Sequence, residues 1–415
     1  MDTLVPILQL VNQFAPGGAE SQFVARLRSH PRGFRPVVGA LQRGGELSAE
    51  VDELGLRVEY FGLRGKLGQL NTGHQMLRIA ALIEREGVRL VHANDFHTNV
   101  LAVPAARLTG AKVICSRWDL AHSCGRPAHF VEAAACRAAD AVVANARAVR
   151  EMLVAEEGVP EERVEVLTNA IDLAAFDGAL RAPPSTPRPP HLALGSDGRF
   201  ARPTVVVPAS LSPVKGHLDL VEAAELVKKS VPGALFLCAG EGPMRPALEQ
   251  QIGERGLRDC VLLLGRRRDV PALLARAHVG CLPSHAEGLS NAIIESMAAG
   301  LPVVATRVGG NAELVEEGPG PETTGHLVPA YRPSLLAQAL IGLLKDPERA
   351  RVFGAAGRRL VEARLTAAAL SARMGELYAR VLAKPRHAGV GSAARGAAAA
   401  VAPTAAGAME ALAGA

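Results

Sequence analysis

Aromatic residues make up only 3% of this 415-residue chain, so Leu, Val, Ile and Ala must fill its cores, for which the 48% hydrophobic content is ample. The length indicates two domains rather than one. The chain has no aromatic-plus-basic stripe, which argues against a protein that binds single-stranded nucleic acid. Its net charge of +5 instead fits phosphate-bearing ligands or an acidic membrane face.

The cysteines are few and lack the spacing of a metal site. None of the six stands in a C-x-x-C pair, which argues against zinc. Cys115, Cys238 and Cys281 lie in apolar runs typical of strands, so we expect them to be small, reduced core residues. Cys124, Cys136 and Cys260 complete the set.

Signals for membrane insertion or export are also missing. The sequence contains no run of eighteen apolar residues, so we expect no transmembrane helix. Residues 1–8 have no cationic region and no cleavage site, and we interpret them as a first strand rather than a signal peptide. The cytoplasm is therefore the expected location.

What the sequence does contain is an alternation of apolar runs and helical patterns. Buried strands are predicted at residues 4–11, 36–41, 57–61, 89–92, 112–115, 141–144 and 164–167. Helical patterns lie between them, for example at 19–29, 72–86 and 98–108. This alternation predicts an α/β domain built on a doubly wound parallel sheet, over residues 1–180.

A change of composition follows. Residues 181–190 hold five prolines that cannot continue a helix or a central strand, and we interpret 181–200 as an interdomain linker. Strands are predicted again at 204–209, 234–239, 260–264, 279–283 and 302–305, which gives a second domain over 201–365. A closing helix is expected at 366–383, and the Ala/Gly-rich residues 385–415 are predicted to be a flexible tail.

Three turns between a strand and a helix are candidate ligand sites, because ligands of such sheets bind beyond the carboxyl ends of the strands. In the first, Gly17 and Gly18 let the backbone approach a ligand at a helix N-terminus, although an ordinary tight turn would look the same. In the second, Lys215 can neutralise a diphosphate or can be a solvated lysine. In the third, Arg266 and Arg267 can meet phosphate or border a base, although a solvated charged turn is the simpler interpretation.

A fourth candidate site contains two carboxylates. Glu287 precedes Gly288 at the start of a predicted helix, and Glu295 lies inside that helix between Ile294 and Met297. A carboxylate among such neighbours is costly unless a partner binds it, and a nearby cation would be the alternative explanation. One loop acid and one helix acid near a helix N-terminus predict a pocket for a polyhydroxylated, phosphorylated ligand.

The run that begins at Glu287 and continues through Glu295 to Thr306 has the E-x7-E pattern of the family 4 glycosyltransferases, retaining enzymes of the GT-B fold. The chain resembles this family over about residues 3–382. The Gly17-Gly18 turn, the turn at Lys215 and the run 169–172 add independent support. The resemblance implies two Rossmann-like domains that face each other across a cleft, with the nucleotide-sugar in the C-terminal domain and most of the acceptor in the N-terminal one.

The resemblance also implies roles for individual residues. Glu295 should bind the ribose hydroxyls, Glu287 should contact the donor sugar, and Lys215 should neutralise the diphosphate. The remaining donor-binding positions are expected at Gly17, Gly18, Ser212, Gly240, Arg266, Arg267, Gly288, Leu289, Ser290 and Asn291. The family needs no metal and no cofactor besides the donor substrate, which suits the absence of an Asp-x-Asp motif.

Two departures from the family pattern affect the expected site. Ser210 and Ser212 stand where the family usually places a phosphate-binding arginine. Trp118 stands where many members have a histidine, although the following Asp119 matches. His122 is a possible substitute for that histidine, with a solvated loop histidine as the alternative. The predicted catalytic residues are therefore Glu287, Lys215, Asp119 and His122.

The predicted activity is that of a hexosyltransferase that acts on a glycan or lipid-linked acceptor, in bacterial envelope or exopolysaccharide synthesis. A non-catalytic protein of the same fold that binds sugar nucleotides is the main alternative. A nicotinamide oxidoreductase would need a G-x-G-x-x-G after the first strand, which is missing. A GT-B epimerase or phosphorylase remains open on fold alone.

The acceptor itself is not identified by any motif. A basic stretch in the acceptor-side domain could dock on an anionic membrane, at whose inner face the protein would then lie, or could be a plain solvated face. Its residues are Arg26, Arg28, His30, Arg32, Arg35, Arg64 and Lys66.

Overall fold

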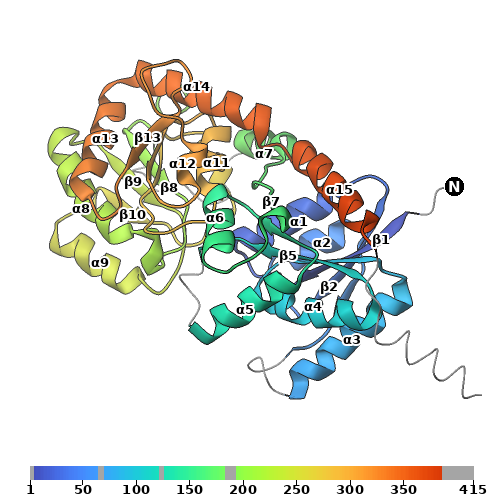
Figure 1. The fold of residues 1–415 in the computed structure, drawn as a ribbon. Coiled ribbons are helices and arrows are strands. Elements are labelled where there is room, and N and C mark those ends of the chain that lie inside the picture. Colours follow the sequence, from blue (N-terminus) through green and yellow to red (C-terminus); the bar gives the residue numbers. More distant parts are fainter. Residues whose placement is uncertain (1–3, 64–69, 121–125, 183–192, 386–415) are drawn as a thin grey trace, which may run out of the picture.

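The computed structural model describes residues 4–63, 70–120, 126–182 and 193–385. Within these ranges the chain forms two parallel β-sheets flanked by helices, in two units that lie side by side (Figure 1). This arrangement confirms the predicted fold class, two Rossmann-like domains of the GT-B type. Cys124, His122, Arg64, Lys66, most of the proline-rich stretch and the tail from residue 386 lie outside the described residues.

The N-terminal domain contains a seven-stranded sheet with the order β3-β2-β1-β4-β5-β6-β7. Its strands are β1 (Val5–Val11), β2 (Phe34–Ala40), β3 (Val58–Tyr60), β4 (Leu90–Ala93), β5 (Lys112–Arg117), β6 (Ala141–Ala144) and β7 (Val164–Val166). Every strand pair is parallel, and β1 pairs with β2 and β4. The order reverses at β1, so the carboxyl end of β1 lies at the switch point where such sheets bind ligands.

Six helices cover the two faces of this sheet. They are α1 (Gly18–Arg28), α2 (Ser48–Glu53), α3 (Leu70–Glu86), α4 (Phe96–Thr109), α5 (Arg126–Ala138) and α6 (Arg147–Ala155). A short 3-10 turn, η1 (Glu161–Arg163), precedes β7. Helix α4 begins two residues before the predicted position because Asp95 caps it: the Asp95 carboxylate accepts from Thr98 N at 3.1 Å, and Thr98 Oγ1 accepts from Asp95 N at 2.9 Å.

The C-terminal domain contains a six-stranded parallel sheet with the order β10-β9-β8-β11-β12-β13. Its strands are β8 (Thr204–Val207), β9 (Leu235–Cys238), β10 (Val261–Leu263), β11 (Val279–Leu282), β12 (Val303–Thr306) and β13 (Gly325–Val328). Its helices are α8 (His217–Ser230), α9 (Arg245–Glu254), α10 (Val270–Leu274), α11 (Asn291–Ala298), α12 (Asn311–Leu314), α13 (Pro333–Lys345) and α14 (Pro347–Arg364), with a 3-10 turn, η3 (Pro213–Lys215), after β8.

The chain crosses between the domains at Ile171, before the expected linker. Ile171 N donates to Leu365 O at 2.9 Å, and Ala367 N donates to Ile171 O at 3.0 Å. The segment that leaves the N-terminal domain at Ile171 therefore lies beside the segment at 365–367 that returns to it. Helix α7 (Leu173–Arg181) already packs against the C-terminal domain, where Asp177 forms a bidentate pair with Arg358 of α14 at 2.6 and 2.9 Å. The described residues thus pass from one domain to the other at Ile171, and the expected linker at 181–200 stays a prediction, since most of its prolines lie outside the described residues.

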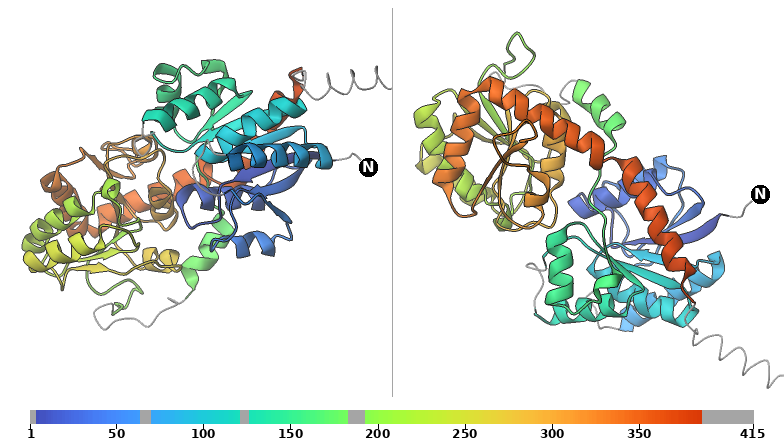
Figure 2. Two further views of the ribbon diagram at one scale, coloured as in Figure 1. Left: turned by 90° about the horizontal axis from the view of Figure 1, so that it is seen from below. Right: turned by 45° about the horizontal axis from the view of Figure 1, so that its top comes forward.

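The last described helix, α15 (Ala367–Ala383), returns to the N-terminal domain (Figure 2). Leu370, Met374 and Tyr378 are buried in one cluster with Ile7 of β1 and Leu90 of β4. Tyr378 OH also accepts from Gln9 Nε2 at 2.9 Å and lies 2.7 Å from His92 Nδ1. The helix thus ties the C-terminal part of the chain to the core of the first domain.

The described cysteines are all buried and free, as expected for Cys115, Cys238 and Cys281. Burial raises the pKa of the Cys238 thiol to about 12. Of the helices that the structure describes, none is both long and apolar enough to cross a membrane.

Candidate functional site

A cleft of about 480 Å³ lies between the carboxyl ends of the two sheets. The C-terminal domain contributes one wall, which includes Ser210, Lys215, Gly240, Arg266, Glu287 and Ser290. The N-terminal domain contributes the other wall, formed by Gly17, Gly18, Gln22, Trp118, Asn145 and Asn169. The cleft therefore occupies the position predicted from strand-end motifs.

Lys215 and Glu287 form an ion pair in this cleft. Lys215 Nζ lies 2.5 Å from Glu287 Oε1, which also accepts from Ser284 Oγ at 2.7 Å. The Lys215 side chain is 25% exposed and that of Glu287 9%. Both residues therefore line the cleft while remaining largely shielded from solvent. The two side chains can bind different parts of one ligand. Lys215 can pair with a charged diphosphate, and Glu287 can accept hydrogen bonds from the hydroxyl groups of a neutral sugar.

The turn that presents Lys215 requires a glycine. Gly216 has φ +64°, and a Cβ there would clash with Pro283 O of the neighbouring loop. This close approach lets the turn at η3 lie directly against the loop that ends in Glu287. Two segments that are distant in the sequence thus present their charges side by side.

Helix α11 points its N-terminus into the cleft. Ser290 caps the helix through a long hydrogen bond from Ile293 N to Ser290 Oγ, 3.4 Å. Gly288 approaches the other domain so closely that a Cβ would clash with Trp118 O. Gly288, Leu289, Ser290 and Asn291 all line the cleft, where the free amides at the helix start favour an anion.

Asn291 links the two walls directly. Its Nδ2 donates to Gly18 O at 3.2 Å, and its Oδ1 accepts from Asn169 Nδ2 at 2.7 Å and from Gln22 Nε2 at 3.2 Å. A donor-binding position predicted from the resemblance is therefore also a bridge between the domains.

Glu295 lies one turn further along α11, on the face that carries Asn291, and it is not among the residues that line the cleft. No cation within the described ranges pairs with it, and burial raises the pKa of its carboxyl to about 7. The alternative explanation, a local ion pair, therefore fails. A half-buried acid without a partner beside the cleft is consistent with a ligand that supplies hydroxyl groups.

The three arginines after β10 differ in their placement. Arg266 lines the cleft, but its guanidinium pairs with Glu46 of the other domain at 2.8 Å, and Arg268 pairs with the same carboxylate at 3.1 Å. Arg267 forms a bidentate pair with Asp269 at 2.6 and 2.7 Å and does not line the cleft. Donor contact by Arg267 stays a prediction without support from its position.

The other predicted residues divide in the same way. Gly240 lines the cleft, and a Cβ there would clash with Ala209 O. Ser212 does not line it, whereas Ser210, 3.3 Å away between hydroxyl oxygens, does. Asp119 is exposed and not among the lining residues, and His122 lies outside the described residues. The predicted catalytic roles of Asp119 and His122 are untested.

On the N-terminal wall, Asn145 is a residue that the motifs did not indicate, whereas Trp118 and Asn169 stand in segments that the resemblance had named. Asn145 donates to Trp118 O at 3.2 Å, and its buried Oδ1 has no partner among the described residues. The buried Oδ1 of Asn169 is likewise unpaired. Two carboxamide acceptors beside the indole of Trp118 suit the hydroxyl groups and C–H face of a sugar. The signal available in the sequence was position, because Trp118 and Asn145 each directly follow a strand.

Two contacts within the N-terminal domain hold the Trp118 side chain in place. Its indole Nε1 donates to Asn94 O, and the Arg26 guanidinium lies 4.8 Å from the ring centroid. Arg26 is only 5% exposed, which corrects the expectation that it belongs to a basic surface. Burial lowers its pKa to about 10. Arg28 and Arg35 pair with Glu50 and Glu86, so the basic stretch presents less free charge than its sequence suggests.

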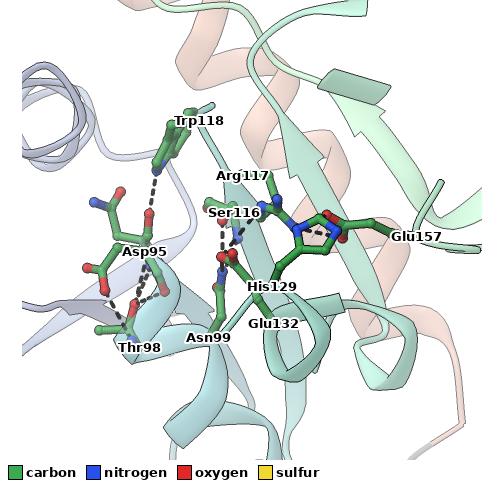
Figure 3. Close-up of polar contacts among 10 residues, drawn as sticks. Asp95, Thr98, Asn99, Ser116, Arg117, Trp118, His129, Glu132 and Glu157 are labelled. Carbon is green, nitrogen blue, oxygen red and sulfur yellow. Dashed lines mark hydrogen bonds and ion pairs between the residues drawn. The ribbon is translucent and has the colours of Figure 1, made fainter. Parts of the chain in front are cut away.

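A buried polar cluster surrounds the end of β5, which stops at Arg117 directly before Trp118 (Figure 3). Arg117 lies between two carboxylates, with Nη1 2.7 Å from Glu157 and Nε 3.5 Å from Glu132. Asn99 Nδ2 donates to Ser116 O at 2.9 Å. Burial raises the pKa of Glu132 to about 7, with Arg117 opposing this and Asp119 adding to it. The residues of the cluster do not line the cleft, but they hold the strand that precedes Trp118 of its wall.

No group of three or more His, Cys, Asp or Glu side chains that could hold a metal ion occurs within the described ranges.

Two family models match the chain. Residues 17–175 match "Glycosyltransferase Family 4", and residues 202–346 match "Glycosyl transferases group 1". One matched segment contains the Gly17-Gly18 turn and the other contains Lys215 and both glutamates.

Several curated proteins are similar in sequence. An alpha-D-kanosaminyltransferase of Streptomyces kanamyceticus is 38% identical over 35% of this chain and 38% of its own length. A GDP-mannose-dependent alpha-(1-6)-phosphatidylinositol monomannoside mannosyltransferase of Mycobacterium tuberculosis is 34% identical over 42% of this chain and 47% of its own. The chain thus spans less than half the length of these two relatives. An alpha-maltose-1-phosphate synthase of Mycolicibacterium smegmatis is 29% identical over 71% and 80%.

Solved structures share the fold. Anabaena Alr3699/HepE in complex with UDP and glucose superposes with a TM-score of 0.76 at 22% identity, over 91% of this chain and all of that one. Sucrose-phosphate synthase from Thermosynechococcus elongatus gives 0.69 at 20% identity, over 91% and 99%.

Proposed function

The chain belongs to the group 1 glycosyltransferases of family 4, and on that premise we propose that it transfers a glycosyl group from a nucleoside diphosphate sugar to an acceptor hydroxyl, with retained anomeric configuration. The observation that supports this most is the Lys215–Glu287 pair at the start of α11, across the cleft from the Gly17-Gly18 turn.

We expect the donor to bind in one orientation. The diphosphate lies between Lys215 and the amides of α11, where positive charge and free N–H groups meet. The ribose should extend toward Glu295, whose carboxyl has no partner among the described residues and whose pKa burial raises to about 7. The sugar extends toward the neutral wall, where Trp118, Asn145 and Asn169 offer an aromatic face and two acceptors.

The chemistry proceeds on the face from which the donor phosphate leaves. The bond between the anomeric carbon and the phosphate oxygen breaks, and its electron pair stays on that oxygen. The acceptor oxygen forms the new bond to the anomeric carbon and gives its proton to the leaving phosphate. Lys215 and the amides stabilise the negative charge most when the bond breaks. Neither glutamate is assigned as a nucleophile, and the proposed reaction needs no metal.

A donor-cleavage assay tests the proposal. Purified protein is incubated with UDP-, GDP- and ADP-hexoses, with and without simple glycoside acceptors, and nucleoside diphosphate release is measured. We expect slow release from one donor class, faster release with an acceptor, and a product of the donor's anomeric configuration by NMR. No release from any donor under either condition would contradict the proposal.

A second candidate function is binding of a sugar nucleotide without turnover. The observation that favours it is the missing phosphate-binding arginine: Ser210 lines the cleft at that place, and Arg266 is engaged by Glu46. In that case the protein would bind one donor class in calorimetry but release no nucleotide in the assay above.

For the acceptor we propose a glycan or lipid-linked hydroxyl used in envelope or exopolysaccharide synthesis, in the cytoplasm and at the inner face of the membrane. Support from the basic stretch is limited, because Arg26 is buried and two further arginines are paired. Sedimentation with anionic liposomes at low salt and release at high salt are the expected results. Protein that stays in the supernatant at low salt would remove the membrane part of the proposal.

A further inference from the structure

Tyr331 has an unusual backbone conformation. Of the non-glycine residues that the structure describes, it alone has a positive φ, 59°. It lies between β13 and α13, and 65% of its surface is exposed. A residue with a Cβ is disfavoured in this region, and glycine would fit without strain. An exposed tyrosine in a position suited to glycine calls for a reason outside the packing of the core.

The tyrosine ring stacks on His285. The ring centroids are 3.9 Å apart and the planes differ by 28°. On its other side, His285 Nε2 lies 3.0 Å from Asp219 Oδ2 in the first turn of α8. His285 is thus held between an aromatic ring from one loop and a carboxylate from a helix.

His285 connects the two segments that carry the charged pair of the cleft. Its backbone N donates to Val214 O, directly before Lys215, at 2.7 Å. Its own loop continues through Ala286 to Glu287, whose carboxylate holds Lys215. Because Gly216 has no Cβ, Pro283 O of the same loop can approach its backbone closely. A displacement of His285 would therefore change the position of Glu287 relative to Lys215.

We propose that Tyr331, acting through His285, is a positioning residue that holds the Glu287 loop against the Lys215 turn before the donor binds. This inference rests on the proposed function for its consequence, although the positioning itself is a property of the ligand-free protein. Ordering this loop in advance removes part of the cost of binding, because the side chains need not be immobilised by the ligand.

Two substitutions separate this role from a merely structural one. Tyr331→Gly removes the ring and relieves the backbone strain, so a tyrosine that only stabilises the fold would give a lower melting temperature, and one without a positioning role would leave donor binding unchanged. Tyr331→Phe keeps the ring and loses only the hydroxyl. The proposal predicts that the glycine variant is at least as stable as the wild type yet binds the donor worse, and that the phenylalanine variant behaves like the wild type.

Hydrogen–deuterium exchange tests the positioning without any ligand. Amides of residues 284–288 should exchange faster in Tyr331→Gly than in the wild type and in Tyr331→Phe, with no change at residues 112–117 in the other domain. Equal exchange of residues 284–288 in all three proteins would overturn the proposal.

Donor binding tests the consequence. With UDP-, GDP- and ADP-glucose as probes, affinity should fall about two- to tenfold in Tyr331→Gly and stay unchanged in Tyr331→Phe, with the loss seen mainly in KM rather than kcat. An unchanged affinity in the glycine variant overturns the proposal. If the wild type binds none of the three probes, the proposed function fails, and the exchange experiment alone decides the positioning.

Discussion

The two walls of the cleft differ in charge and in how the chain builds them. The C-terminal wall presents Lys215 and Glu287 at the N-terminus of α11. The N-terminal wall presents glycines, an indole and carboxamides, while its nearest cation, Arg26, is buried behind the indole. One wall is thus suited to the charged part of a ligand and the other to its neutral part. The difference predicts that loss of Lys215 in the first wall affects the diphosphate and that substitutions in the second wall affect the sugar.

The largest effect is expected at Lys215. Lys215→Ala removes the cation that stabilises the leaving diphosphate, and kcat should fall about 10–1000-fold. Steady-state kinetics with the active donor measure this. Lys229→Ala is the matched control, because that lysine is exposed on α8 and pairs only with Glu225. If both variants keep wild-type kcat, the charged wall has no catalytic part.

The next largest effect is expected where the walls meet. Gly288→Ala places a Cβ against Trp118 O and would force the domains apart, and a displacement of this kind costs about a hundredfold in rate. Gly342→Ala is the control, since a Cβ there meets nothing within 4 Å. Small-angle scattering should show a more open Gly288→Ala protein, and full activity in this variant would show that the walls need not approach so closely.

Glu295 of α11 does not line the cleft in the ligand-free protein, but it should give donor binding a pH dependence. Its pKa of about 7 means that the ionised form, which accepts hydrogen bonds from ribose hydroxyls best, declines below neutral pH. Donor KM should rise about fivefold from pH 7 to pH 6 in the wild type, and the pH dependence should be absent in Glu295→Gln. Measuring the donor KM of both proteins from pH 7 to pH 6 tests this expectation. The same pH profile in both proteins would exclude a role of Glu295 in binding the ribose.

The same carboxyl affects stability with a defined sign. Its folded pKa of about 7 exceeds the usual 4.5, so the folded protein binds more protons between these values. The free energy of unfolding that Glu295 contributes should therefore fall as pH rises from about 4.5 to about 7. Urea titrations should show that Glu295→Gln lacks this fall. Parallel pH profiles for the two proteins would mean that the carboxyl is not desolvated.

A smaller effect is expected in the neutral wall. Asn145→Ala removes an unpaired acceptor and the hydrogen bond to Trp118 O, each worth about 1 kcal/mol, and should lower kcat/KM for the sugar donor several-fold. Affinity for the nucleoside diphosphate without its sugar should not change. A loss that is equal for donor and nucleoside diphosphate would break the division between the walls.

The smallest effect is expected at the mouth of the cleft. Glu46→Gln releases Arg266, which can then turn to the diphosphate, so donor affinity should rise by less than about threefold at low salt. The gain should vanish at high salt because exposed charges are screened. Calorimetry at two salt concentrations measures it, and weaker donor binding in this variant would show that the pair stabilises the bound form.

The sequence predicted the two walls unequally. The strand–helix alternation indicated the fold, and two local motifs, the turn at Lys215 and the segment from Glu287 to Glu295, indicated the charged wall. The neutral wall is assembled from separate segments that meet only in the folded sheet, so no local motif contains it. Contacts such as Asn291 with Gly18 and Asn169 join positions more than a hundred residues apart, and no local pattern predicts them.

Arg26 shows an error that the sequence could have prevented. Its basic neighbours suggested an exposed surface. The helical pattern points the other way, because Phe23, Arg26 and Leu27 have the spacing of one buried face, and all three are buried in α1.

The central claim is that the charged wall binds a sugar nucleotide. Thermal unfolding of the wild type and of Glu295→Ala, each with UDP-, GDP- and ADP-sugars, measures this most directly, because a ligand of the folded state raises the melting temperature. The account predicts that one nucleotide class raises the melting temperature of the wild type and raises that of Glu295→Ala much less. Equal shifts in both proteins, or no shift with any sugar nucleotide, would contradict it.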